Sequence, residues 1–137
     1  MTIKEVSEKY DIPADTLRYY ERVGAIPPVT RTAGGIRDYQ QEDIGWVELA
    51  KCMRSAGLPI EVLIEYLTLF KEGDSTIPAR FELLTAQREV LLDQRRQIDE
   101  TLARLDYKIG RYKIAMEGGD LSWETGEEPD WTAEKNQ

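Results

Sequence analysis

The chain has 137 residues and a formal net charge of −8, with no histidine and a single cysteine. This length suits one domain with an appendage rather than two full domains. The missing histidines and the lone cysteine exclude a Cys/His zinc site within one chain and the usual general base near neutral pH. We therefore expect no enzyme, no metal site and no cofactor. One cysteine and the lack of a long apolar run favour a cytoplasmic protein without a membrane span.

The negative charge is concentrated at the C-terminal end. Residues 117–137 contain seven acids and one lysine, a net −6, which leaves −2 for residues 1–116. The acidic, Gly- and Pro-containing composition predicts a disordered tail over 117–137, in which Trp123 and Trp131 have no evident role. Because the net charge of residues 1–116 is small, the arrangement of their lysines and arginines decides whether they can bind DNA.

Two short helices joined by a tight turn are expected at the start of the chain. Thr2 and Glu5 have the spacing of a capping box, and apolar residues then follow at helical spacing. Pro13 interrupts this pattern. A second helix is expected over about 14–23, and Gly24 is placed to end it. The pair predicts a helix-turn-helix.

A small β-hairpin and two further helices are expected next. Turn residues at 32–35 separate two short extended segments, which together predict a wing. A third helix should run over about 41–56 and a fourth over about 59–71, with a loop at 72–75. The predicted fold is therefore mainly α, with a winged helix-turn-helix head over 1–76 that has four helices and a β-hairpin wing.

Residues 77–116 predict one long helix with a coiled-coil seam. Apolar side chains recur every seven residues at two heptad positions, with Arg88 and Arg95 as charged breaks. No second long amphipathic helix is available in the chain, so the seam indicates a homodimer, although it does not decide between parallel and antiparallel pairing. The expected seam residues are Phe81, Leu84, Leu91, Ile98, Leu102, Leu105, Ile109 and Tyr112.

The second helix and the wing both offer arginine and tyrosine. The helix carries a polar face at spacings i, i+3, i+4 and i+7, made by Asp15, Arg18, Tyr19 and Arg22. Arg37 and Tyr39 would share one face of the hairpin because side chains alternate along a strand. Arginine can bridge base edges or phosphates, and a tyrosine hydroxyl can donate to phosphate. Taken singly, these residues equally suit a solvated surface with an ion pair between Arg18 and Asp15.

Two runs in this region resemble the MerR family of transcription regulators. They are residues 16–28 (TLRYYERVGAIPP) and residues 35–39 (GIRDY), the latter followed by acidic 42–44. The resemblance covers about residues 1–116. It implies a dimer joined by an antiparallel coiled coil over 77–116, whose two heads bind double-stranded promoter DNA. Such regulators distort an overlong promoter spacer so that RNA polymerase can engage both promoter elements.

The resemblance also suggests which residues contact DNA. It implies contacts at Thr16, Arg18, Tyr19, Arg37 and Tyr39. To these we add Arg22, which lies on the same polar helix face.

Cys52 is the candidate sensor. Metal-sensing relatives carry cysteines near the end of the long helix and drug sensors carry a large C-terminal domain, whereas this chain has neither. Residues 39–58 and 69–74 resemble the thiol-based, aldehyde-responsive AdhR/NmlR-like branch, which implies that formaldehyde or methylglyoxal alkylates Cys52. Helical spacing instead places Cys52 beside Leu49 and Ala56, which is typical of an inert core thiol. Both interpretations stay open from the sequence.

Two other functions fit the same scaffold. In one, a non-covalent apolar ligand binds between the third and fourth helices and the partner's coiled coil; ordinary core packing equally explains the residues that would line this site, Trp46, Met53, Leu63 and Tyr66. In the other, the coiled coil is the working part of a protein-interaction adaptor, which the overall acidity favours.

Overall fold

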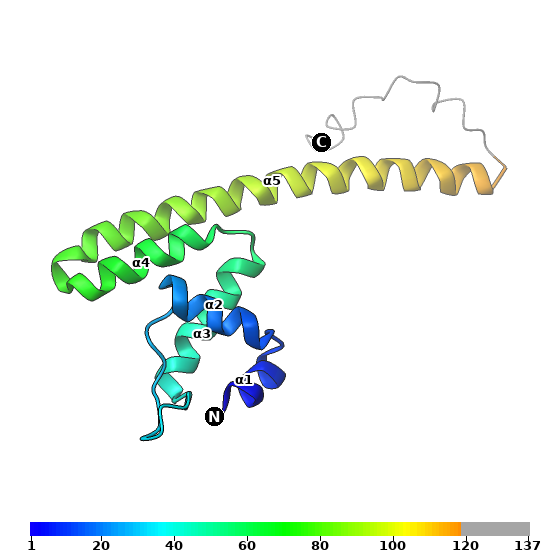
Figure 1. The fold of residues 1–137 in the computed structure, drawn as a ribbon. Helices are drawn as coiled ribbons and strands as arrows, with labels where there is room; N and C mark the ends of the chain where they lie inside the picture. The colour runs from blue at the N-terminus through cyan, green and yellow to red at the C-terminus, as the bar shows by residue number, and fades with distance from the viewer. Residues whose placement is uncertain (119–137) are drawn as a thin grey trace. The chain divides into compact units, whose positions relative to one another are not determined.

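The computed structural model describes residues 1–118, which are mainly α-helical (Figure 1). The predicted mainly α fold, with four helices before one long helix, is confirmed. Almost all of the predicted tail lies outside the described residues, and so do Trp123 and Trp131. The elements are α1 (Ile3–Tyr10), α2 (Ala14–Val23), α3 (Gln41–Ser55), α4 (Ile60–Glu72), a 3₁₀ turn η1 (Asp74–Thr76) and α5 (Ile77–Met116).

The chain divides into two compact units, Met1–Arg88 and a second unit that begins at Glu89. The first unit, which we call the head, contains α1 to α4 and the first turns of α5. The boundary predicted at residue 76 marks the start of α5, whereas the head continues past it to Arg88. The assignment of 1–76 to DNA binding, 77–116 to dimerisation and 117–137 to a tail stays a prediction.

The first two helices form where their capping signals predict them. The Thr2 hydroxyl accepts from the Glu5 amide at 3.1 Å, and the Glu5 carboxylate accepts from the Thr2 amide at 3.2 Å, so the predicted capping box is present. After α1 the chain turns through a left-handed Asp11, and α2 ends at Gly24 with φ of 82°. Glycine adopts this left-handed conformation without the steric cost that a Cβ would add. The two helices pack against each other.

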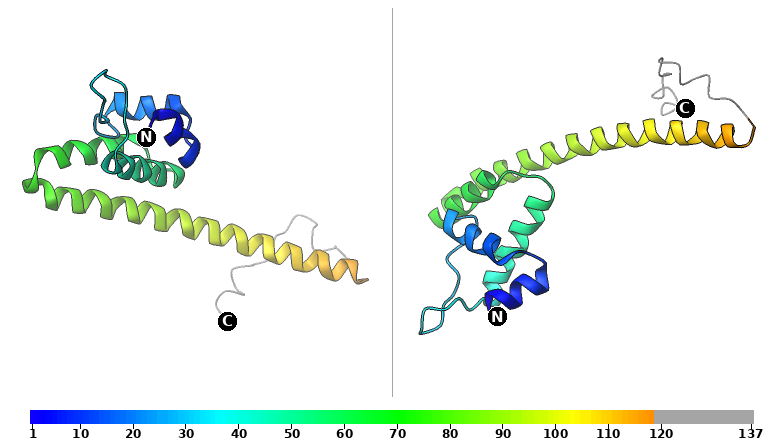
Figure 2. Two further views of the ribbon diagram at one scale, coloured as in Figure 1. Left: turned by 90° about the horizontal axis from the view of Figure 1, so that it is seen from below. Right: turned by 45° about the vertical axis from the view of Figure 1, so that its right-hand side comes forward.

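The wing is smaller than the hairpin predicted from the sequence. Within residues 1–118, its pairing is one antiparallel bridge between Arg31 and Arg37, and the loop projects from the helices in Figures 1 and 2. The ladder stops because the next inward-facing amide, that of Gln40, donates to the Asp43 carboxylate at 2.8 Å, and Pro28 on the other arm has no amide. The outward-facing amides of Val29 and Tyr39 donate to the Glu21 carboxylate at 2.6 Å and to the Met1 carbonyl at 2.7 Å.

The remaining helices of the head enclose its core. α3 begins at the predicted residue and ends one residue early, because Gly57 follows with φ of 86°. α4 begins after Pro59, and the loop expected at 72–75 is instead the end of α4 followed by η1. Fully burying a large aliphatic side chain stabilises a fold by roughly 1.5–3 kcal/mol. The buried apolar residues include Val6, Leu17, Ile26, Val47, Ala50, Met53, Leu58, Leu63 and Leu67.

The turn between α4 and α5 is held by Thr76 and Arg80. The buried Thr76 hydroxyl donates to the Leu69 carbonyl at 2.6 Å, which closes the C-terminal end of α4. Arg80 donates from Nε to the Thr76 hydroxyl at 3.1 Å, and its guanidinium lies 5.4 Å from the centre of the Phe70 ring. These contacts explain why the first turns of α5 belong to the head.

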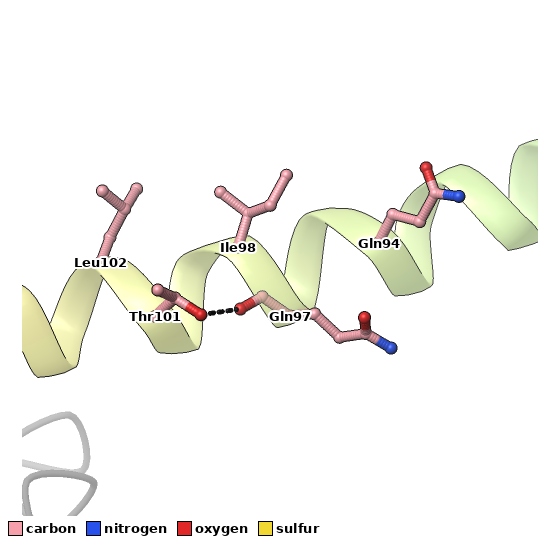
Figure 3. A pocket seen from close by; sticks show the side chains of 5 residues that line it. All are labelled: Gln94, Gln97, Ile98, Thr101 and Leu102. Atoms are coloured by element: carbon pink, nitrogen blue, oxygen red, sulfur yellow. Dashed lines mark hydrogen bonds between the residues drawn. The ribbon is translucent and has the colours of Figure 1, made fainter. Parts of the chain in front are cut away.

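The second unit is the continuation of α5 from Glu89. No side chain of α5 is buried, and its seam residues include Ile98, which is 60% exposed, and Leu102, which is 49% exposed. Figure 3 shows these two side chains on the same side of the helix, where they line a pocket together with Gln94, Gln97 and Thr101. No helix up to Gly118 combines the length and apolarity needed to cross a membrane.

Candidate nucleic-acid interface

The predicted polar face of α2 lies on the surface of the head. Arg18, Tyr19 and Arg22 are all exposed. The Arg22 guanidinium lies 5.4 Å from the centre of the Tyr19 ring, so the two side chains form one unit. Arg18 donates to Asp15 at 2.9 Å, which is the ion pair that the sequence left as an alternative. Because both partners of that pair are exposed, it holds Arg18 only weakly.

The N-terminal turn of α2 adds backbone donors to this surface. The N-cap residue is Pro13, which makes no side-chain capping bond to the helix. The first amides of an α-helix have no partner within the helix and favour anions such as phosphate. Thr16 lies in this turn and is half-buried. Its predicted DNA contact would therefore lie beside the first amides of α2 and not beside Arg22 and Tyr19.

Glu21 connects α2 to the wing. Its carboxylate accepts from the Val29 amide at 2.6 Å, from Arg37 Nε at 2.8 Å and from an Arg31 terminal nitrogen at 3.2 Å. The Glu21 side chain is only 10% exposed. A nearly buried carboxylate needs such partners, because burying an unpaired charge is costly. We call Glu21, Arg31 and Arg37 the wing cluster.

The environment of Glu21 changes its pKa. Burial alone would raise the pKa of Glu21, but the Val29 amide, Arg37 and Arg31 together outweigh burial and hold that pKa below its ordinary value. Glu21 is therefore ionised at neutral pH, and the wing cluster then carries two positive charges and one negative charge.

Sequence reasoning missed Glu21 and Arg31. A signal was available, because Glu21 follows the buried Leu17 by four residues and therefore lies toward the core side of α2. An acid at such a position is seldom buried without a cation. Two arginines in the predicted wing, Arg31 and Arg37, were the available partners.

Tyr39 lies in the core and not on the surface. The sequence placed it beside Arg37 on an exposed face, and this placement is wrong: Tyr39 is 1% exposed whereas Arg37 is half-buried. The reason is that the chain leaves the wing before Tyr39, whose amide pairs with Met1. Burial raises the pKa of the Tyr39 hydroxyl, although nearby Arg37 lowers it in part. Its DNA contact stays a prediction that needs the hydroxyl to become accessible.

Cys52 is exposed on α3, so the core location that helical spacing indicated is wrong. The neighbouring cations bond elsewhere. Lys51 donates to the Tyr10 carbonyl at the end of α1, and Arg54 donates to the Leu58 carbonyl at 2.6 Å. Neither cation interacts with the thiol. Of the two features that favour thiol reactivity, accessibility and a nearby cation, Cys52 therefore has accessibility.

The residues of the alternative apolar site pack in the head. Met53 and Leu63 are buried. The Trp46 ring lies 5.0 Å from that of Phe70 and 6.3 Å from that of Tyr66, both within the range of packed aromatic pairs. Met53 and Leu63 therefore belong to the core, whereas the three rings pack against one another at its edge, since Phe70 is 45% exposed. Residues 1–118 contain no group of three His, Cys, Asp or Glu side chains that could hold a metal ion.

These features define a DNA-binding helix-turn-helix protein, in which the second helix has an exposed Arg/Tyr face and is tied to a wing. Residues 1–69 match the family described as MerR HTH family regulatory protein. The match covers half of the chain, and the protein therefore belongs to the MerR family of regulators.

Individual relatives agree with this assignment. The HTH-type transcriptional regulator AdhR of Bacillus subtilis (strain 168) is 57% identical over 93 residues, a match that covers 68% of this chain and 66% of AdhR. A MerR family transcriptional regulator from Listeria monocytogenes has a TM-score of 0.80 and 50% identity, with 82% of this chain and 86% of that chain covered. HiNmlR, a MerR family regulator lacking the sensor domain and solved bound to promoter DNA, has a TM-score of 0.77 and 29% identity, with coverages of 87% and 94%.

Proposed function

We propose that the protein is a homodimeric regulator that binds double-stranded promoter DNA through α2 and the wing. The observation that carries this proposal is the exposed Arg22–Tyr19 pair on a helix that Glu21 joins to Arg37 of the wing. Together they supply guanidinium groups from two elements, and such groups are frequent donors to the phosphate oxygens of DNA. The similarity to HiNmlR, which was solved bound to promoter DNA, supports promoter binding.

The exposed seam of α5 supports a homodimer. A helix with a repeating apolar stripe is stabilised when a partner helix covers that stripe. An antiparallel pairing of two α5 helices would place one head at each end. Two heads on one rigid element can bind a two-fold site and distort the DNA between them, which costs on the order of 1–6 kcal/mol by smooth elastic estimates. RNA polymerase would then respond to the distorted promoter without contacting the regulator.

A gel shift with the DNA upstream of the protein's own gene tests this function. The affinity should fall steeply as salt rises, because phosphate contacts release counterions. Arg22→Ala should weaken specific binding about tenfold or more, as expected for a base or phosphate contact. Lys113→Ala, which removes the same charge near the end of α5, is the matched control. Equal affinities for Arg22→Ala and wild type would contradict the assigned surface, and binding insensitive to salt would favour the adaptor function.

We further propose that a reactive aldehyde modifies Cys52 and so changes the output of the regulator. The exposed thiol and the similarity to AdhR support this proposal. The Cys52 sulfur would add to the carbonyl carbon of formaldehyde or methylglyoxal to form a hemithioacetal. The thiol proton passes to the aldehyde oxygen, so no oxidant is needed. The modification must favour one of two DNA-bound states to act as a signal.

The sensor is tested by promoter transcription with wild type and Cys52→Ser after methylglyoxal treatment. Wild type should respond and the mutant should not, and the intact mass of wild type should show an adduct at inducing doses. A mutant that responds like wild type would exclude Cys52. A response that Cys52→Ser retains, with no mass change of wild type in the presence of aldehyde, would instead identify a non-covalent ligand; reversal on dialysis does not separate the two, because a hemithioacetal also dissociates when the aldehyde is removed.

A further inference from the structure

Glu21 occupies the junction between α2 and the wing, and its carboxylate holds the wing at three points. These are the backbone amide of Val29 at the start of the wing, Arg31 on one arm and Arg37 on the other. The bridge between Arg31 and Arg37 is the one backbone pairing within the wing that residues 1–118 contain. The N-terminus holds the far end of the wing, where Met1 bonds Asp38 and Tyr39, and Glu21 is the α2 side chain that bonds both arms.

We propose that Glu21 is a positioning residue for DNA binding, which fixes the wing on α2 and orients Arg37 toward a DNA phosphate. Glu21 itself does not touch DNA in this proposal. The inference rests on the proposed promoter-binding function and goes beyond it by assigning different roles to the two arginines of the wing.

The hydrogen bonds distinguish Arg37 from Arg31. Arg37 bonds Glu21 through Nε at 2.8 Å, which leaves the two terminal nitrogens of its planar guanidinium for a bidentate contact. Arg31 uses one terminal nitrogen for Glu21 at 3.2 Å and the other for the Gly35 carbonyl at 3.2 Å. In this proposal Arg31 stabilises the wing internally, and Arg37, whose two terminal nitrogens make no hydrogen bond within residues 1–118, contacts DNA.

Neutralising Glu21 distinguishes a positioning role from an effect of charge alone, because the two predict opposite changes in DNA affinity. Removing an acid close to DNA lowers the repulsion of phosphates and should strengthen binding. Positioning predicts that binding weakens, because Arg37 loses the charged acceptor that orients it. Glu21→Gln is the appropriate variant, because its amide oxygen can still accept from the Val29 amide and its volume is nearly the same.

The experiment measures operator affinity against salt for wild type, Glu21→Gln, Arg37→Lys and the double variant. Glu21→Gln should bind about tenfold more weakly, since hydrogen bonds to charged groups are the strong ones. The slope of log affinity against log salt concentration should fall by about the amount of one phosphate contact, although Arg37 is still present. Arg37→Lys keeps the charge and lacks Nε, so adding Glu21→Gln to it should cost little more.

Glu8→Gln is the matched control, because it removes the same charge from an exposed position on α1. Thermal unfolding and stoichiometric DNA titration measure the folded, active fraction, which a purely structural defect would lower without changing the salt slope. Glu21→Gln binding as tightly as wild type or more tightly, with an unchanged slope, would overturn the role of Glu21 alone. Wild type that binds DNA without salt dependence would overturn the promoter-binding function itself.

Discussion

The head buries a core of apolar side chains, whereas the second unit leaves apolar side chains of the same kind exposed. In the head, leucines such as Leu63 and Leu67 are buried by helices of the same chain. In the second unit, Leu102 and Leu105 are each 49% exposed, although they follow a regular heptad spacing. Since burial of apolar surface is the main favourable term in folding, we expect the head to form from one chain and the stripe on α5 to be stabilised by a partner.

This contrast separates two kinds of stability. The head should unfold with a free energy that does not depend on protein concentration. Pairing through α5 should depend on protein concentration, because association of two chains follows mass action. Two kinds of substitution test this difference. Charges placed in the seam should abolish pairing, and the same truncation made in the two regions should separate the stability of the head from the affinity of pairing.

The largest effect is expected from charges in the seam. Ile98→Lys combined with Leu105→Lys should give a monomer by light scattering, because two lysines would be buried at the pairing surface. Operator affinity should fall by about 10²- to 10⁴-fold as the gain from linking two heads is lost. Glu100→Lys, on an exposed part of α5 outside the seam, is the control and should stay dimeric. A double variant that remains a dimer would show that pairing does not use this seam.

A smaller effect is expected from leucine truncation, which compares the two regions directly. Leu67→Ala should destabilise the head by about 2–5 kcal/mol, as for other large-to-small core substitutions. Leu105→Ala should leave head unfolding unchanged and shift only the dimer dissociation constant. Urea denaturation of both variants at two protein concentrations measures the difference. Equal, concentration-independent losses would show that the second unit is stabilised within one chain.

The wing cluster gives the stability of the head a pH dependence. The pKa of Glu21 is lowered in the folded state, so its contribution to stability is present above the ordinary glutamate pKa of 4.5 and disappears as the pH falls through the folded pKa. Wild type should therefore be more stable than Glu21→Gln at pH 7, and the two should converge in acid. Urea denaturation from pH 7 to pH 3 measures this. A constant difference would contradict the assigned pairing.

The smallest effect is expected for Tyr39→Phe. The Tyr39 hydroxyl is buried and has no hydrogen-bond partner within residues 1–118, so its removal should leave stability unchanged or raise it by up to about 1 kcal/mol. Operator affinity should stay within about twofold, well below the 1–3 kcal/mol of a direct contact. A tenfold loss of affinity in a normally stable variant would show that the hydroxyl reaches DNA and that the core opens there.

Local signals predicted the helices well. The capping box at Thr2, the glycine after α2 and the heptad repeat each depend on residues within one or two turns of one another. The bounds of α2 and α5 therefore match the sequence prediction closely. The exposed arginines of α2 followed from the same helical spacing.

Long-range contacts account for what the sequence did not predict. Strand alternation placed Tyr39 beside Arg37, but the Tyr39 amide pairs with Met1, which is distant in sequence. The wing cluster similarly joins Glu21 to Arg37 across the loop. Helical spacing placed Cys52 beside apolar neighbours, yet burial depends on what covers that side of α3, which spacing alone does not specify.

The single bridge of the wing also bears on how the protein avoids aggregation. An exposed strand edge with unpaired amides is a template for pairing with another chain. Here the amides on either side of the bridge, those of Val29 and Tyr39, are already bonded to Glu21 and Met1. The wing can therefore project into solvent without offering another molecule an edge long enough to extend into a sheet.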